Sequence, residues 1–132
     1  MNDFEIWLEK STENLLAAEV CFKGGHFNAC ANRLYYAMFQ AGIAALEKFR
    51  VKLPEKVVGH GWVQATFSEQ LIRRRKIFPA KFSSYLTDAY RVREIADYRM
   101  SSISKKVVSR ELRKANEFLA SIKKETGYET YL

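Results

Sequence analysis

A polar segment in the second half of the chain, AYRVREIADYRM (89–100), holds the residues best suited to chemistry. Arg91 and Arg93 carry planar guanidinium groups, which can hold a phosphate through paired hydrogen bonds. Asp97 and Tyr98 follow them and supply a carboxylate and a hydroxyl group. Because these groups interrupt an otherwise apolar helical pattern, we interpret the segment either as an anion-binding site or as a polar network beside the core.

The spacing within this segment predicts which side chains meet. At 100° per residue, Arg93 and Asp97 lie about one turn apart and can form an ion pair at the edge of an apolar stripe that includes Ala96. Arg91 and Tyr98 are expected together on the other side of the helix. For the Arg93–Asp97 pair we favour a structural role at the margin of the core, and anion binding stays open as the alternative.

Proton transfer near neutral pH is most often carried out by histidine, and the chain has only His26 and His60. Both lie far from the polar segment in sequence. We therefore expect both to be ordinary surface or capping residues, with the return of His60 to the polar segment as the alternative. Tyr35 and Tyr36 could stack on a base, but aromatic residues in so apolar a helix are expected in the core.

A second basic feature is the run RRRK (73–76), in a chain of net charge +7. A solvated helix end is the favoured interpretation of this run, and a phosphate-binding patch with salt-dependent, sequence-blind affinity is the alternative. The positive balance favours nucleic acid or another polyanion as a partner. Cys21 and Cys30 form neither a disulfide framework nor a metal-binding pattern, so neither a metal nor a cofactor is expected.

Helical periodicity accounts for the rest of the chain and predicts an all-α fold in a single domain, 1–132. Apolar residues recur at steps of three and four along five segments, at about 3–22, 27–49, 62–73, 79–98 and 104–124. Asp3 and Asn28 are the expected N-caps of the first two helices, and Pro79 is expected in the first turn of the fourth. The second helix is apolar almost all round, which is typical of a central element. We expect an up-down bundle of four long helices plus a short one.

The same sequence predicts the compartment. No apolar run is long enough to cross a bilayer, and the first residues are too acidic and polar for a signal peptide. A cytoplasmic protein with no membrane partner is therefore expected.

Three parts of the sequence together resemble the HEPN domain (higher eukaryotes and prokaryotes nucleotide-binding) family. They are ANRLYYAMFQAGIAAL (31–46), the loop with His60 followed by Phe67, and REIADY (93–98) before a final helix. The resemblance implies a bundle of four long helices plus a short one, and a homodimer with the polar motif near the dimer cleft. It also implies a partner, because prokaryotic members are often encoded beside a minimal nucleotidyltransferase in a toxin–antitoxin-like pair.

Catalytic members of that family are metal-independent ribonucleases, whose signature is an Arg, four to six residues, and a His that is often followed two positions later by a Tyr. Aligned on Tyr98, this signature puts Arg91 at the Arg position and Ala96 at the His position, so the residue for proton transfer is missing. The sequence instead resembles the members that carry Arg-x-x-Ala-Asp-Tyr, with Arg93, Asp97 and Tyr98 as the characteristic positions.

We therefore expect a protein that binds a nucleotide, RNA or a partner protein without catalysis. The residues expected to take part are Arg33, Tyr36, His60, Arg91, Arg93, Asp97 and Tyr98. The first alternative is a toxin-type endoribonuclease that uses Arg91 or Arg93 with Asp97 or His60 as the base. The second alternative is a purely structural, dimeric interaction module.

Overall fold

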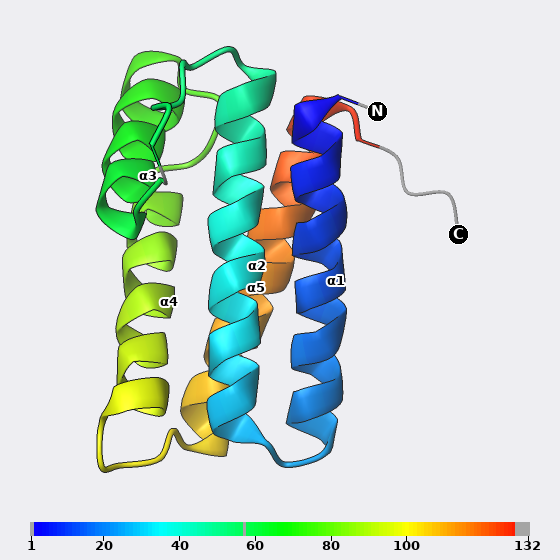
Figure 1. The fold of residues 1–132 in the computed structure, drawn as a ribbon, viewed down its shortest axis with the longest axis vertical. Helices are drawn as coiled ribbons and strands as arrows, with labels where there is room; N and C mark the ends of the chain where they lie inside the picture. The colour runs from blue at the N-terminus through cyan, green and yellow to red at the C-terminus, as the bar shows by residue number, and fades with distance from the viewer. Residues whose placement is uncertain (1, 57, 129–132) are drawn as a thin grey trace.

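The computed structural model describes residues 2–56 and 58–128, and all regular structure in these ranges is helical. The four long helices are α1 (Asp3–Lys23), α2 (Phe27–Lys48), α4 (Lys81–Tyr98) and α5 (Lys105–Thr126). The short α3 (His60–Thr66) continues directly into the π-helical segment η1 (Phe67–Arg74), and both pack beside α4 (Figure 1). The expected all-α, up-down bundle of four long helices plus a short one is confirmed.

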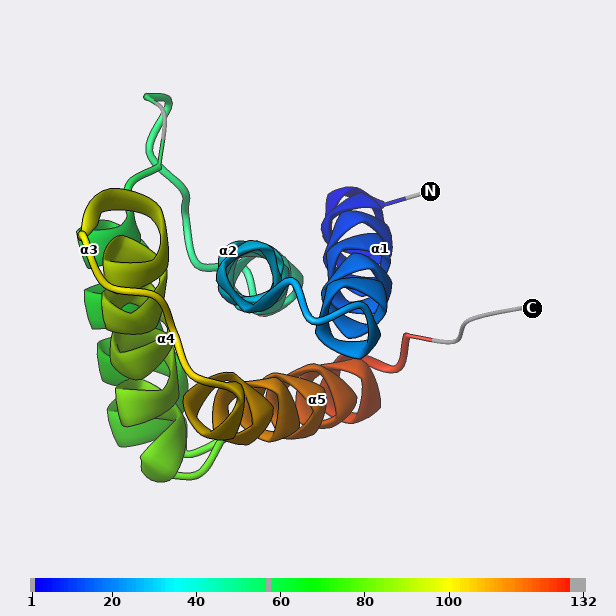
Figure 2. The same ribbon diagram turned by 90° about the horizontal axis from the view of Figure 1, so that it is seen from below.

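Helix α2 is the central element, as its apolar circumference predicts. It packs against α1, α4 and α5, and Figure 2 shows it between α1 and α4 with α5 on one side. Small residues such as Ala37, Ala41 and Ala44 are fully buried along it and allow the neighbouring helices to approach closely. In Figure 2 none of the described helices covers the side of α2 that faces away from α5.

Two contacts fix the neighbours of α2 at short range. The Ser11 hydroxyl of α1 is fully buried and donates a hydrogen bond of 2.7 Å to the carbonyl of Ala37. On the other side, a Cβ atom at Gly42 would lie 3.3 Å from Cγ1 of Val63, so the absence of a side chain lets α3 approach α2. The core is therefore close-packed on both sides of α2.

The helix ends differ in detail from the sequence prediction. Asn2, not Asp3, is the N-cap of α1, and its backbone N–H donates to the side chain of Glu5 at 3.3 Å. The N-cap of α2 is His26, so the prediction of Asn28 as the cap is wrong. The Asn28 amide oxygen instead accepts a 3.0 Å hydrogen bond from the backbone N–H of Ile103, and this bond ties the start of α2 to the α4–α5 connection.

The third helix also differs from the prediction. It begins at His60 rather than at residue 62, and its second half, η1, has the wider turns of a π-helix. These turns let the consecutive Leu71 and Ile72 both face the core together with Phe67. Pro79 lies before α4 and not in its first turn, and its carbonyl accepts from the backbone N–H of Phe82 at 3.1 Å.

A partly buried ionic cluster joins α4 to α5. Lys114 Nζ lies 3.0 Å from Glu111 Oε2 and 3.2 Å from Asp88 Oδ2. Only 3% of Glu111 is exposed, so Lys114 neutralises a carboxylate that has almost no access to water. None of the described helices is both long and apolar enough to span a membrane.

Candidate functional site

The side chain of Arg93 lies on α4 among four tyrosine rings. Its guanidinium carbon is 4.8 Å from the ring centre of Tyr35, 5.5 Å from those of Tyr36 and Tyr90, and 5.7 Å from that of Tyr98. Two of these rings come from α2 and two from α4. These four tyrosines are called the tyrosine cage below. At such distances each ring attracts the cation, and only 12% of the Arg93 side chain is exposed.

Two carboxylates complete the surroundings of Arg93. Its guanidinium nitrogens lie 3.6 Å from Asp97 Oδ2 and 3.6 Å from Glu94 Oε1. The predicted Arg93–Asp97 pair is therefore confirmed, and Glu94 is an additional partner. The Nε atom of Arg93 is buried and has no hydrogen-bond partner among the described residues. The charge of Arg93 is thus balanced within the protein, as the structural interpretation of the pair requires.

His60, at the start of α3, belongs to the same cluster. Its ring stacks on Tyr90 with centroids 4.0 Å apart and an interplanar angle of 16°, and its Nδ1 atom lies 3.4 Å from the Tyr35 hydroxyl. The favoured interpretation of His60 as an ordinary surface or capping residue is therefore wrong. It returns to the polar segment because α3 begins at this residue and packs against both α2 and α4.

The protonation of these two groups follows from their burial. Burial lowers the pKa of His60 below its ordinary value, and the nearby positive charge of Arg93 lowers it further. Burial also raises the pKa of Tyr35, so its hydroxyl keeps the proton and can donate it to Nδ1 of a neutral His60. At neutral pH the cluster therefore contains the neutral imidazole of His60 and the charged guanidinium of Arg93, which is largely shielded from solvent.

A chain of amide and guanidinium groups extends the site from α4 across α2 to α1. The Asn32 amide donates to Asp97 at 2.8 Å, and Arg33 Nε donates to the Asn32 oxygen at 2.9 Å. Arg33 Nη1 then donates to Asn14 at 2.9 Å, and Asn14 donates to Gln40 at 2.8 Å. The sequence prediction included Arg33 but missed Asn32 and Asn14. The sequence did contain a signal for Asn32, because Asn32, Arg33 and Gln40 are the only strongly polar residues between positions 30 and 46 of this helix.

Arg33 also links this chain of groups to the tyrosine cage. Its guanidinium carbon lies 5.4 Å from the ring centre of Tyr36, the same ring that Arg93 contacts. Tyr36 is half-buried, whereas Tyr35 is buried as expected of a core residue. Two cations therefore share one partly accessible aromatic ring.

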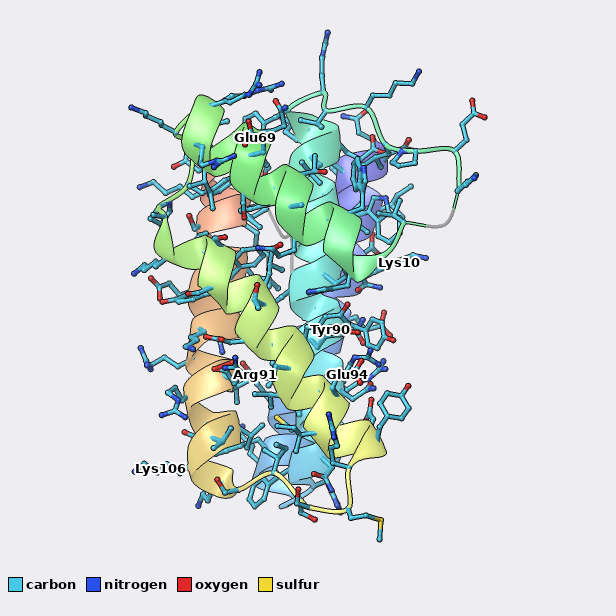
Figure 3. The ribbon with its side chains drawn as sticks, turned by 90° about the vertical axis from the view of Figure 1, so that its left-hand side faces the viewer. Lys10, Glu69, Tyr90, Arg91, Glu94 and Lys106 are labelled. Atoms are coloured by element: carbon cyan, nitrogen blue, oxygen red, sulfur yellow. The ribbon has the colours of Figure 1, made fainter. Side chains whose placement is uncertain are left out.

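Arg91 lies apart from the cage. Its guanidinium pairs with Asp88 at 2.9 Å, and Figure 3 shows Arg91 on one side of α4 and Tyr90 and Glu94 on the other. The prediction that Arg91 and Tyr98 lie together is wrong. Long side chains on a helix reach back over the preceding turn, so Arg91 meets Asp88, and the Tyr98 ring lies near Arg93 instead.

The cysteines and acidic residues do not form a second site. Cys30 is fully buried, and burial together with the neighbouring Cys21 raises the pKa of its thiol to about 11. Within 2–56 and 58–128, no three His, Cys, Asp or Glu side chains gather as the ligands of a metal ion would.

Comparison with known families decides the identity of the fold. A sequence model of the HEPN domain matches residues 4–125, which is nearly the whole chain. The chain belongs to the HEPN domain family. A comparison with curated proteins finds no match. Membership of the HEPN family supports a function related to nucleotides or RNA.

In this HEPN chain the position that the resemblance aligns with the catalytic histidine has a packing role. Ala96 is partly buried and packs against the core through its small side chain. One histidine, His60, does come close to the polar motif, but it belongs to α3, which precedes α4 in the sequence. The imidazole of this HEPN chain is thus held against Tyr90 rather than next to Asp97 on α4.

We expect His60 to make the stability of this HEPN chain depend on pH below neutrality. The folded state holds His60 with a lowered pKa, so the unfolded state binds the proton first as the pH falls through about 6.5. The free energy of unfolding should therefore decrease between pH 7 and pH 5, and part of that decrease should disappear in His60→Gln. Urea unfolding at several pH values measures this. His26→Gln changes an exposed ring and is the matched control; equal pH profiles for the wild type and His60→Gln would contradict the prediction.

Proposed function

We propose that this HEPN protein binds a nucleotide or a short RNA strand at the tyrosine cage and does not cleave it. The observation that carries the proposal is the set of aromatic rings gathered around a cation whose charge the protein balances itself. Tyr98 is 68% exposed and Tyr36 is half-buried, so both can present ring surface to a base. Stacking on such rings tolerates any base and is worth about 1–3 kcal/mol per base.

The surroundings of Arg93 support binding rather than catalysis. An arginine that stabilises the transition state of phosphoryl transfer must reach the developing charge directly. Arg93 is almost buried and already faces the carboxylates of Asp97 and Glu94. In our proposal it is a positioning residue that holds the tyrosines in place, and Arg33 supplies a cation beside the accessible ring of Tyr36.

Tyr98→Ala tests the proposal directly. Adenosine monophosphate and a single-stranded RNA of about ten nucleotides would be titrated into the protein by calorimetry, in EDTA. We expect the variant to bind the RNA about tenfold more weakly, which corresponds to the loss of one stacked base. Its melting temperature should fall by only about 2–5 °C, because the exposed Tyr98 ring makes one contact with Arg93 and little other packing. Met100→Ala removes an even more exposed side chain two residues further on and should bind like the wild type; unchanged binding by Tyr98→Ala would contradict the proposal.

One observation favours a second function, a metal-independent ribonuclease. His60 lies beside the cage, and its lowered pKa keeps the imidazole neutral, so that it is free to accept a proton as a general base. Incubation of the protein with RNA in EDTA separates the two functions. Cleavage that is lost in His60→Ala and in Arg93→Lys would establish the ribonuclease and overturn binding without catalysis.

We also propose that the protein forms a homodimer and acts with a minimal nucleotidyltransferase, as many prokaryotic HEPN proteins do. A hollow of about 390 Å³ on the open side of α2 supports an interface there. It is lined mainly by apolar residues of α1, α2 and the connection that follows α2, among them Trp7, Phe39, Ile43, Leu53, Pro54 and Val58. Sedimentation of the wild type and of Phe39→Glu tests the dimer. A dimer that binds no nucleotide or RNA would instead favour the purely structural interaction module.

A further inference from the structure

A second region of the molecule concentrates positive charge, away from the tyrosine cage. It lies where α2 and η1 end side by side. The Arg75 guanidinium donates a hydrogen bond to the carbonyl of Phe49, the residue that follows α2. The next residue in each segment, Arg50 and Lys76, is therefore brought to the same corner of the molecule. We call the following five exposed residues the basic corner: Arg50, Arg73, Arg74, Arg75 and Lys76.

The charges of the basic corner are only partly balanced. Arg73 and Arg74 both pair with the single carboxylate of Glu69, and their side chains remain 74% and 68% exposed. Arg50 and Lys76 have no carboxylate partner within the described ranges 2–56 and 58–128. Two cations thus share one anion and two more face solvent, which leaves a net positive field at this end of the bundle.

The backbone at the basic corner is unusual as well. Arg50 has φ = 59° and Lys76 has φ = 52°, and these are the two non-glycine residues with positive φ in the described part of the chain. Each follows the end of a helix, where glycine is the residue best suited to the left-handed conformation. A side chain at such a position lowers stability. The dipole of each helix favours a cation near its C-terminus by about 0.3–1 kcal/mol, but this is less than the cost of about 1–2 kcal/mol for a side chain in the left-handed conformation. The use of a long cation at both positions is therefore consistent with a role for the charge.

We infer that the basic corner binds the phosphodiester backbone of a nucleic-acid strand, independently of the tyrosine cage. Guanidinium groups pair well with phosphate, and flexible exposed cations accept a backbone in any register. The corner contains no exposed aromatic ring, so it is suited to phosphates and not to bases. The net charge of +7 for the whole chain agrees with a polyanionic partner. Binding there would be blind to sequence and would weaken steeply with salt.

The double variant Arg50→Gly/Lys76→Gly tests this inference because it separates charge from folding. Glycine relieves the left-handed backbone, so we expect the melting temperature to rise by about 2–5 °C. Binding of a fluorescent single-stranded RNA of about 20 nucleotides, followed by anisotropy over a range of salt concentrations, should be about tenfold weaker. The plot of log K against log salt should become shallower by about 1.4, because two phosphate contacts are lost. A DNA strand of the same sequence should give the same result, since only the backbone is contacted.

Lys106→Ala is the matched control, because Lys106 is an exposed cation that Figure 3 shows at the opposite end of the molecule from Glu69. It should leave the affinity and the salt dependence unchanged. The inference is overturned if the double glycine variant binds like the wild type, if Lys106→Ala weakens binding equally, or if only RNA binds. The Tyr98→Ala titration gives the separate answer for the tyrosine cage. If only Tyr98→Ala loses binding, the proposal for the basic corner is refuted and the proposal for the tyrosine cage stands. If only the double glycine variant loses binding, the cage is refuted and the basic corner stands.

Discussion

Replacement of Lys114 by methionine is expected to lower the free energy of unfolding by about 3 kcal/mol, the lower end of the range for removing one partner of a buried ion pair. Methionine retains the length and most of the apolar stem of lysine, so the change isolates the charge. Lys114 Nζ contacts Glu111 and Asp88, and Glu111 lies in the core between α4 and α5. Without Lys114, the Glu111 carboxylate would remain buried and unpaired, or it would have to take up a proton.

The protonation of Lys114 shows that the cluster favours the charged form. Burial alone would lower the pKa of Lys114, but the hydrogen bonds and charges of Glu111 and Asp88 outweigh it and raise the pKa. A group whose pKa is raised on folding contributes its stability below its unfolded pKa. The contribution of Lys114 is therefore complete at neutral pH and decreases only as the pH rises above about 10.4.

Urea unfolding followed by circular dichroism measures the effect of Lys114→Met. The double variant Lys114→Met/Glu111→Gln removes the stranded charge as well and should recover a large part of the lost stability. Lys106→Met, on the exposed side of α5, should change stability by less than about 0.5 kcal/mol. A loss below about 1 kcal/mol in Lys114→Met, or no recovery in the double variant, would show that the cluster is not the anchor between the two helices.

Replacement of Arg93 by methionine is expected to affect both the fold and the ligand. The change removes the cation from four tyrosine rings and leaves Asp97 and Glu94 without their partner. We expect a loss of about 2 kcal/mol in the free energy of unfolding, since each close contact between a cation and a ring contributes about 0.5–1 kcal/mol and the buried position limits repair by water. Binding of the RNA strand at the cage should fall by more than tenfold.

Near-ultraviolet circular dichroism, urea unfolding and calorimetric titration of RNA together test this prediction. The tyrosine signal should change in Arg93→Met even where the protein is fully folded, because the rings lose the group that orients them. Arg91→Met is the matched control on the same helix, since Arg91 is exposed and, in the part of the chain that the structure describes, pairs only with Asp88. A variant Arg93→Met that is as stable as the wild type and binds RNA equally well would refute the positioning role of Arg93.

Local patterns in the sequence were sufficient to predict most of the fold. The helical steps of apolar residues located the four long helices, and the apolar circumference of α2 identified the central one. The spacing of four residues was also sufficient for the Arg93–Asp97 pair, because the partners lie on one helix. Each of these features depends on residues that are neighbours in sequence, where periodicity carries the information.

The remaining features of the site depend on packing between distant segments. His60 meets Tyr90 and Tyr35 only because α3 folds back onto α2 and α4, and nothing in the sequence around Gly59 and Gly61 indicates this. The π-helical turns of η1 likewise follow from the need to bury Leu71 and Ile72 together. Competing contacts also decide side-chain direction, as when Arg91 meets Asp88 rather than Tyr98.

The bond between Asn28 and the backbone of Ile103 has a consequence for the time course of folding. It joins residues 75 positions apart, so the chain must close a long loop before the bond can form. The helical hairpin α1–α2 needs only the short turn at Gly24–Gly25 and can form first. We expect the Asn28 bond to form in the late, long-range part of the reaction, together with the contacts between α1 and α5, which close still longer loops. An interaction that forms after the transition state slows unfolding without accelerating folding, so the loss of this one amide side chain should shorten the lifetime of the native state.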